Sequence, residues 1–334
     1  KKDKKFKVFI TRPIPNVGIN MLKKHFQVKV RKTDSPIPKS ELETEIKKCD
    51  GILTILTDQI DSDMMDLNPK LRIISNFAVG YNNIAVVGAT KRGIPVGNTP
   101  DVLTQSTAEH ALALIMDITK RVAEGDRIMR PDAFMGWGPM FMLGAEIYNK
   151  NVGIVGCGRI GGQLAKMMHK AFNCKILYTG HYDNEAVENS TKAKRVSLAN
   201  LLKQSDIVSI HVPLFPQTTH LIGAKEFKIM KKTAYLINTA RGPIVDEKAL
   251  LKALKKHEIA GAGLDVFENE PRRLSGLDKC ENVVMTPHTA SATWEARNKM
   301  SEVAAQNIIG ILVKGESPVS IVNPSVLNDK NYYD

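Results

Sequence analysis

The sequence lacks the features that mark a membrane-embedded, secreted or metal-stapled protein. No hydrophobic run approaches the ~20 consecutive apolar residues that a membrane-spanning helix needs. No apolar signal core follows the lysine-rich first residues. The four cysteines form no C-x-x-C pair, and no histidine lies at metal-ligand spacing from them. We therefore expect a cytoplasmic protein without a metal site, whose Cys49, Cys157, Cys174 and Cys280 are small buried hydrophobic residues.

Acidic residues are scarce in the first fifty positions, where fourteen Lys and Arg outnumber six Asp and Glu. This segment therefore holds eight of the twelve excess positive charges of the chain. Because it has no interleaved aromatic residues and no nucleic-acid-binding motif, we interpret it as a solvated face and expect no nucleic-acid partner. The basic bias can steer anionic substrates toward a cleft, an effect that salt would screen. Nucleic-acid binding stays an alternative, which strongly salt-dependent retention on DNA would reveal.

Short β-branched segments alternate with segments of helical period, which is typical of parallel α/β winding. The sequence predicts strands at 8–11, 27–30, 51–54, 71–75 and 94–96, and helices at 17–26, 41–49, 104–130 and 291–314. A second β/α series runs from 151 to about 286. The predicted fold is α/β, with two doubly wound parallel-sheet domains. Residues 99–289 form one of them, inserted between 1–98 and 290–334 of the other.

The most specific motif is a G-x-G-x-x-G over Gly156, Gly158 and Gly161, between an apolar strand and a helix. Gly156 permits a tight turn, Gly158 lets a pyrophosphate approach the backbone, and Gly161 allows close packing of helix on strand. Amides near Arg159 and Ile160 would donate to the phosphate oxygens. A further strand at 175–178 completes the βαβ unit, so residues 99–289 are expected to form a Rossmann-type dinucleotide-binding domain.

An acidic side chain is missing where the second strand of this unit ends. Such an acid would bond the ribose 2′-hydroxyl of NAD and repel the 2′-phosphate of NADP. Thr179 stands there instead, followed by Gly180, His181 and Tyr182, and Asp183 lies further down the loop. This absence favours NADP over NAD as cofactor and leaves NAD open. A 2′-phosphate could also be read elsewhere, for example by Lys192 or Arg195.

Three later segments each end an apolar strand and then deliver a charged residue: Arg241, Glu270 and His288. The carboxyl ends of strands line the ligand crevice of an open α/β sheet, so the three side chains are expected to meet there. Arg241 would hold a substrate carboxylate and polarise its carbonyl group. His288 would protonate the carbonyl oxygen, and Glu270 would keep the imidazolium populated.

At these residues the sequence resembles the D-isomer-specific 2-hydroxyacid dehydrogenase family. The matching segments are 156–161, 206–214, 238–247 (NTARGPIVDE), 263–268 and 286–288, with 78–84 and 98–100 in the first domain. The resemblance covers nearly the whole chain. It implies a flavodoxin-like substrate domain around the cofactor domain, and the catalytic roles already assigned to Arg241, Glu270 and His288.

The resemblance also implies contacts beyond the catalytic residues. Backbone amides at Val79 and Gly80 would bind the substrate carboxylate, and the pocket around Leu53, Val79 and Trp137 would select the substrate. Asp265 would lie near the nicotinamide carboxamide. The remaining expected cofactor contacts, besides the glycine loop and Thr179, are Thr104, His181, Val212, Pro213, Thr218, Thr239, Ala240 and His288.

Segment 137–144 is similar to the glyoxylate/hydroxypyruvate reductase branch, in which Trp137 would lie over the active site of a neighbouring subunit. We therefore predict a homodimer that reduces glyoxylate, hydroxypyruvate or a similar 2-keto acid to the D-2-hydroxy acid. The alternatives are a phosphoglycerate-type or other D-2-hydroxyacid dehydrogenase, and a cofactor-sensing binding protein of the corepressor type.

Overall fold

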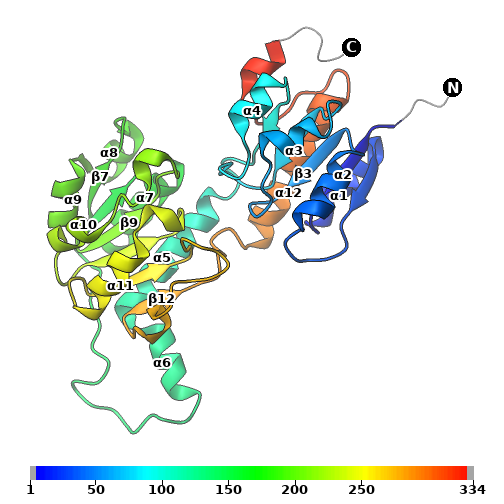
Figure 1. Ribbon diagram of the computed structural model, residues 1–334. Coiled ribbons are helices and arrows are strands. Elements are labelled where there is room, and N and C mark those ends of the chain that lie inside the picture. The colour runs from blue at the N-terminus through cyan, green and yellow to red at the C-terminus, as the bar shows by residue number, and fades with distance from the viewer. Residues whose placement is uncertain (1–4, 329–334) are drawn as a thin grey trace. The chain divides into compact units, whose positions relative to one another are not determined.

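The protein, described over residues 5–328 in a computed structural model, divides into two compact units (Figure 1). Unit 1 comprises residues 1–103 and 292–334, and unit 2 comprises residues 104–291. The boundaries expected from the sequence, 98/99 and 289/290, fall a few residues earlier. The chain beyond residue 98 still packs in unit 1, because Thr99 donates its N–H to the Ala78 carbonyl (2.8 Å). No helix among the described residues is long and apolar enough to cross a membrane.

Unit 1 contains a five-stranded, fully parallel sheet in the order β2-β1-β3-β4-β5. The strands are β1 (Lys7–Ile10), β2 (Gln27–Val30), β3 (Gly51–Thr54), β4 (Ile73–Asn76) and β5 (Val96–Gly97). This order is that of flavodoxin-like doubly wound sheets. Every residue of β3 and β4 is buried, as expected where helices cover both faces of a parallel sheet.

The helices of unit 1 come from both ends of the chain. They are α1 (Asn16–His25), α2 (Lys39–Ile46), α3 (Ser62–Asp66), α4 (Val86–Lys91) and α12 (Trp294–Leu312). Thr293 caps α12 by accepting a hydrogen bond from the Ala296 N–H (3.2 Å). Helix α12 packs directly on α1, where Gly18 leaves no room for a Cβ against the Ser301 backbone. The C-terminal segment thus completes the first domain.

Unit 2 contains a seven-stranded, fully parallel sheet in the order β12-β11-β10-β9-β6-β7-β8. The strands are β6 (Asn151–Val155), β7 (Lys175–Thr179), β8 (Lys194–Arg195), β9 (Ile207–Ile210), β10 (Tyr235–Asn238), β11 (Gly261–Leu264) and β12 (Val283–Met285). The chain starts at β6, winds outward to β8 and returns to β9 on the other side. The predicted pair of doubly wound parallel sheets is confirmed, and the strand order of unit 2 reverses between β6 and β9.

The helix expected over 104–130 is two helices, α5 (Thr104–Lys120) and α6 (Val122–Met129). Arg121 between them adopts a left-handed conformation (φ 58°), and the Asp117 carboxylate accepts a hydrogen bond from the Ala123 N–H (2.7 Å). The single-helix prediction was wrong because the apolar spacing continues across this break. The other helices of unit 2 are α7 (Arg159–Phe172), α8 (Glu185–Thr191), α9 (Leu198–Gln204), α10 (Ala224–Ile229) and α11 (Glu247–Lys255).

All four cysteines are free thiols. Cys49 and Cys174 are buried as predicted, whereas Cys157 and Cys280 are partly exposed. Cys157 lies in the turn between β6 and α7, where it packs against the core with part of its surface exposed. Burial raises the pKa of Cys49 to about 12 and that of Cys157 to about 11, so neither thiol is ionised near neutral pH.

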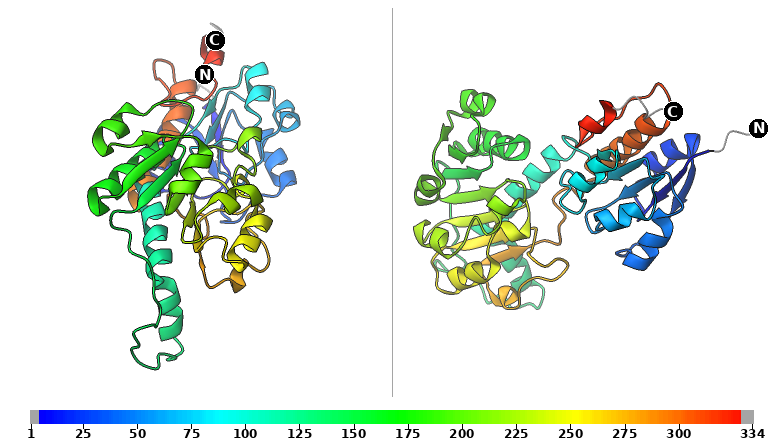
Figure 2. Two further views of the ribbon diagram at one scale, coloured as in Figure 1. Left: turned by 90° about the vertical axis from the view of Figure 1, so that its left-hand side faces the viewer. Right: turned by 45° about the horizontal axis from the view of Figure 1, so that its top comes forward.

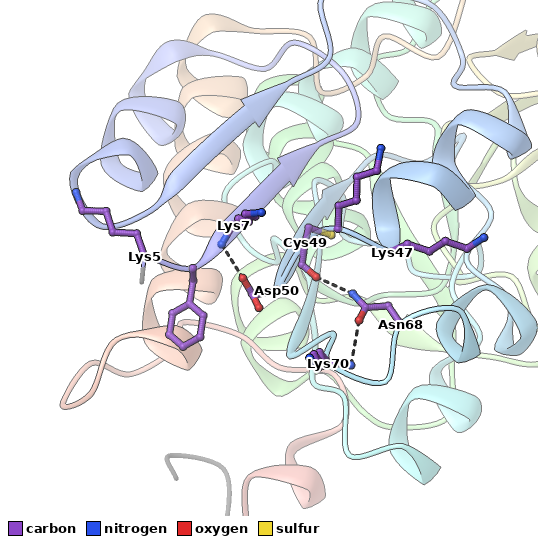
Figure 3. A pocket seen from close by; sticks show the side chains of 9 residues that line it. Lys5, Lys7, Lys47, Cys49, Asp50, Asn68 and Lys70 are labelled. Carbon is purple, nitrogen blue, oxygen red and sulfur yellow. Dashed lines mark hydrogen bonds between the residues drawn. The ribbon is translucent and has the colours of Figure 1, made fainter. Parts of the chain in front are cut away.

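Part of the basic charge of the first fifty residues gathers around a cavity at the amino ends of β1 and β3 (Figure 3). Four lysines of this segment line it, Lys5, Lys7, Lys47 and Lys48, together with Lys70 from later in the chain. The single carboxylate, Asp50, accepts the backbone N–H of Lys7 (2.7 Å), and the side chains of Lys5 and Lys47 point away from each other. This charge therefore lies at the edge of the sheet opposite to its strands' carboxyl ends.

Candidate active site

The glycine loop joins β6 to α7 beside the point where the strand order of unit 2 reverses. Gly156 has φ 93°, and a Cβ there would press on Val212 Cγ1 (2.7 Å) and on the backbone of His211. A Cβ on Gly161 would collide with the Gly156 carbonyl oxygen. Beyond Gly158, by contrast, no atom of the described chain lies within 4 Å of a Cβ position. The loop is tight inside the protein and open on its outer side, as a pyrophosphate cradle requires.

Two further features fit a bound dinucleotide. Helix α7 begins after Gly158 without a side-chain cap, and the first turn of a helix leaves backbone N–H groups without intrahelical acceptors. Arg159 and Ile160 lie in this turn. After β10, which is separated from β6 by β9 in the sheet, the buried Thr239 hydroxyl has no hydrogen-bond partner among the described residues. An orphaned buried hydroxyl is rare, and a ligand atom would satisfy it.

Strand β7 ends without the acidic residue that is typical of NAD-binding sheets, and a cationic side chain from β8 lies against the loop that follows. Thr179 ends the strand, and the Arg195 guanidinium from β8 reaches the loop that follows. It donates to the Gly180 carbonyl (2.8 Å) and to the His181 carbonyl (3.0 Å), and it pairs with Asp183 (2.9 Å). Of the two basic residues considered for this place from the sequence, Arg195 is the one that contacts this loop.

The pair formed by His288 and Glu270 is the clearest chemical feature of unit 2. His288 Nδ1 lies 2.8 Å from Glu270 Oε2, and the other carboxylate oxygen accepts the Phe267 N–H (3.0 Å). His288 follows β12 with φ 54°, and its N–H donates to the Asp265 carbonyl (2.9 Å). Since Nδ1 is engaged with the carboxylate, Nε2 is the nitrogen left for proton transfer.

Electrostatics keep Glu270 ionised. Burial alone would raise its pKa, but the hydrogen bond from His288, with the positive charges of His288 and Arg241, holds the pKa below its usual value. Arg241 follows β10 and donates to the Ala240 carbonyl (2.7 Å). Burial lowers the pKa of Arg241, and the charge of Glu270 counteracts this. The structure thus brings a carboxylate, an imidazole and a guanidinium together at the carboxyl ends of neighbouring strands.

Asp265, at the end of β11, has no exposed surface. Its carboxylate accepts hydrogen bonds from the Thr286 hydroxyl (2.6 Å) and from the backbone N–H groups of Thr289 and Ala290 (both 2.8 Å). These donors flank His288, so the Asp265 side chain anchors the loop that carries the His288 imidazole. Contact between Asp265 and a nicotinamide carboxamide stays a prediction. In this structure the Asp265 carboxylate has no exposed surface for such a contact.

His110 of α5 was not anticipated from the sequence. Its Nε2 lies 2.9 Å from the Thr286 hydroxyl and 3.3 Å from Asp265 Oδ1. A histidine within a helix of ordinary apolar spacing carries no local signal of such a role. Only the packing of α5 against β11 and β12 brings it beside the anchor of the His288 loop.

The remaining predicted cofactor residues lie near the carboxyl ends of the same strands. Thr218 donates its hydroxyl hydrogen to the Pro213 carbonyl (2.7 Å) and accepts the Phe215 N–H (2.8 Å), which shapes the loop after β9. Val212 packs against Gly156, Ala240 donates its N–H to Asn238 (3.0 Å), and Thr104 begins α5. Their contacts with a cofactor stay predictions.

Within unit 1, Val79 and Gly80 follow β4. Their carbonyl oxygens accept hydrogen bonds from the side chains of Asn98 and Asn76 (both 2.9 Å), and neither backbone N–H has an acceptor among the described residues. Two fixed, neighbouring N–H donors suit a carboxylate. Leu53 corrects the sequence-based pocket: it is 0% exposed, because β3 is central in the sheet, so it is a core residue without surface to offer a substrate.

Trp137 lies in the segment that follows α6 and is 86% exposed. Helix α6 and this segment extend away from the sheet of unit 2 (Figure 2). Other large apolar side chains of the segment are exposed as well, among them Met135, Met140 and Leu143. In its own chain Trp137 packs against little, so a substrate contact by this residue stays a prediction that requires a second copy.

A Rossmann-type sheet whose strand ends carry an arginine and a glutamate–histidine pair defines a nicotinamide-dependent oxidoreductase. Comparison with known proteins narrows this class. Residues 112–290 match the model of the NAD-binding domain of D-isomer-specific 2-hydroxyacid dehydrogenases. The chain belongs to the D-isomer-specific 2-hydroxyacid dehydrogenase family.

Similar proteins include glyoxylate reductases from two archaea. The chain is 46% identical to that of Korarchaeum cryptofilum and 47% identical to that of Pyrococcus horikoshii, with 96% of this chain and 97% of each relative covered. Among solved structures, a Thermus thermophilus protein superposes with a TM-score of 0.88 at 35% identity, covering 95% of this chain and 99% of the other. An NADPH-dependent glyoxylate/hydroxypyruvate reductase from Sinorhizobium meliloti, in complex with NADP and malonate, gives 0.83 at 29% identity, covering 95% and 97%.

Proposed function

We propose that the protein reduces glyoxylate, hydroxypyruvate or a similar small 2-keto acid to the D-2-hydroxy acid with a nicotinamide cofactor, preferentially NADPH. The observation that carries this proposal is the His288–Glu270 pair, 2.8 Å apart, at the same sheet edge as the glycine loop. The similarity to glyoxylate reductases over 96% of the chain supports the substrate class.

Arg241 would bind the keto acid through its planar guanidinium, which matches a carboxylate and can also polarise the neighbouring carbonyl. Within unit 1, the N–H groups of Val79 and Gly80, which have no acceptor among the described residues, are likewise suited to a carboxylate. A short 2-keto acid presents its carboxylate and its carbonyl group side by side, so the Arg241 guanidinium would orient the carbonyl group as it binds the carboxylate.

His288 would give a proton from Nε2 to the carbonyl oxygen as the alkoxide develops. Glu270, kept ionised by its lowered pKa, holds Nδ1–H and stabilises the charged imidazole before the transfer. When bound, the cofactor supplies the hydride. The glycine loop, the first turn of α7 and the Thr239 hydroxyl would hold it.

The cofactor preference is inferred from the end of β7. Thr179 offers no carboxylate to bond a 2′-hydroxyl, and the Arg195 guanidinium lies against the following loop. A cation at this place attracts a 2′-phosphate, although Asp183 partly neutralises it. Both features favour NADPH over NADH.

A homodimer would cover the exposed apolar segment after α6, since contiguous apolar patches on a protein surface mark interaction sites. Trp137 would then reach the partner rather than its own site. The four free cysteines suit a reducing compartment such as the cytoplasm. Light scattering of the purified chain should give the mass of a dimer, and a monomer would contradict this part of the proposal.

The function is tested by initial rates with glyoxylate, hydroxypyruvate and pyruvate, each with NADPH and with NADH. Reduction of glyoxylate or hydroxypyruvate, faster with NADPH, is expected. Cofactor binding without turnover of any of the three acids would favour the corepressor type of binding protein instead.

A further inference from the structure

Glu247, the first residue of α11, is buried and wholly occupied by the loop that carries Glu270. Only 5% of the residue is exposed. Its Oε1 accepts the Glu268 N–H (2.7 Å), and its Oε2 accepts the Leu274 N–H (3.2 Å). In return, the Glu247 N–H donates to Glu268 Oε1 (2.9 Å). One carboxylate therefore joins two points of the loop, one on each side of Glu270.

The contacts on Glu270 itself are few. Apart from His288, it bonds the Phe267 N–H at the start of the loop, and the Asn269 carbonyl accepts the Arg272 N–H within it (2.9 Å). Neither contact ties the loop to the rest of unit 2. Glu247 supplies such a tie, since it stands on a helix that packs against the sheet core through Leu250 and Leu254.

The turn that bears Arg241 meets the loop at the same place. Gly242, next to Arg241, lies so close to the backbone of Phe267 and Glu268 that a Cβ there would overlap both. The Glu268 side chain in addition contacts His220 Nε2 (2.9 Å). The segment from Gly242 to Glu247 thus shapes both the arginine turn and the glutamate loop.

Burying a carboxylate in order to bind two amide N–H groups costs desolvation free energy. Burial raises the pKa of Glu247, and the charges of Glu268 and Glu270 add to this, against the hydrogen bonds of the amides. A neutral Gln would avoid the cost of the charge but has only one acceptor oxygen for the two N–H groups. The need to hold both ends of the loop therefore accounts for a glutamate here.

We propose that Glu247 is a positioning residue, which holds the loop 268–274 so that Glu270 stays at hydrogen-bond distance from His288. This inference rests on the proposed function, because it describes how the proton-transfer pair of that reaction is kept aligned. It assigns Glu247 no contact with substrate or cofactor.

The test compares Glu247→Ala and Glu247→Gln with Asp246→Ala. Asp246 is a matched control, since its carboxylate caps the same helix through the Ala249 N–H (3.0 Å).

Glu247→Ala should lower kcat by about tenfold or more, because a small displacement of a reacting group lowers the reaction rate by up to ~100-fold. Glu247→Gln should lower kcat by a smaller factor, because glutamine retains one acceptor oxygen. The cofactor Kd should stay unchanged, and the fall of activity on the alkaline side should begin at lower pH, because a displaced Glu270 holds the proton of the pair less firmly.

Hydrogen exchange on the cofactor-free protein gives a readout without turnover. Amides of the loop 268–274 should exchange faster in both Glu247 variants and at the wild-type rate in Asp246→Ala. Unchanged exchange and an unchanged alkaline limb in the Glu247 variants would overturn the proposal, even if their Tm falls. An inactive wild-type protein whose loop still loosens in Glu247→Gln would instead count against the proposed function alone.

Discussion

The two residues of the proposed catalytic pair, His288 and Glu270, are held in place by different kinds of anchor. The His288 loop is fixed by Asp265, which has no exposed surface and receives a side-chain hydroxyl and two backbone N–H groups within 2.8 Å. The Glu270 loop is fixed by Glu247, which receives two N–H groups, one of them at 3.2 Å. The loop of His288 is thus held by more and shorter hydrogen bonds to its anchor than the loop of Glu270.

The pKa shifts of the two anchors have opposite signs. Burial would raise the pKa of Asp265, but hydrogen bonds from His110, Thr286, Thr289 and Ala290 outweigh it and leave the pKa lowered. At Glu247 burial dominates, and the neighbouring Glu268 and Glu270 raise the pKa further. Burial disfavours the ionised form of a carboxylate unless enough hydrogen-bond donors surround it.

The largest effect is expected at the pair itself. His288→Ala should lower kcat by about 100- to 10,000-fold, since it removes the proton donor, with little change in cofactor Kd. Arg241→Ala should raise KM for the keto acid as well as lower kcat. Steady-state kinetics checks both, with the exposed His257→Ala of unit 2 as the control. If His288→Ala kept a tenth of the wild-type kcat, His288 would not be the proton donor, and the comparison of the two loops would lose its meaning for catalysis.

The next effect concerns the anchor of the His288 loop. Asp265→Asn places an amide where two oxygens accept N–H and hydroxyl donors, so it should cost about 2–3 kcal/mol of unfolding free energy and lower kcat. Denaturant unfolding and kinetics measure the two effects. His110→Ala, which leaves the Asp265 carboxylate in place, should cost less in both respects. Equal losses at Asp265 and His110 would contradict the central role given to Asp265.

The opposite pKa shifts predict opposite pH dependence of stability. A lowered pKa in the folded state contributes stability above the unfolded pKa, which is lost as the pH falls, so the cost of Asp265→Asn should shrink below about pH 4. A raised pKa contributes stability below the unfolded pKa, which is lost as the pH rises, so the cost of Glu247→Gln should grow toward acid pH. Unfolding at several pH values tests this, and parallel trends would refute the contrast.

The smallest effect is expected at the cofactor end of the sheet, away from both anchors. Thr179→Asp should shift the ratio of kcat/KM toward NADH by about tenfold, because a carboxylate repels a 2′-phosphate. Arg195→Ala should weaken NADPH more than NADH, while Lys192→Ala serves as a control. A preference lost on Lys192→Ala and kept on Arg195→Ala would move the phosphate contact to Lys192. Loop exchange and acid stability should stay unchanged in all three variants.

Much of the fold, and the residues of the proposed reaction centre, could be predicted from local sequence patterns. Alternating periods predict two parallel sheets, and the glycine spacing predicts the turn at Gly156, where the structure has φ 93°. Arg241, Glu270 and His288 could be named because each follows an apolar strand. Leu53 was misjudged because only the central place of β3 in the sheet shows that its side chain is enclosed. His110 had no local signal, and Glu247 ends the matching segment 238–247 without a role of its own, since each acts on residues more than twenty positions away.

The order of residues alone decides where strands end, and with it which charged side chains face the ligand edge of a parallel sheet. It also decides where glycine is needed and that β7 ends without an acid. Tertiary packing decides which buried carboxylates serve as anchors and which loops they hold. That choice depends on burial and on hydrogen-bond donors contributed by distant segments, and neither is encoded in the spacing of neighbouring residues.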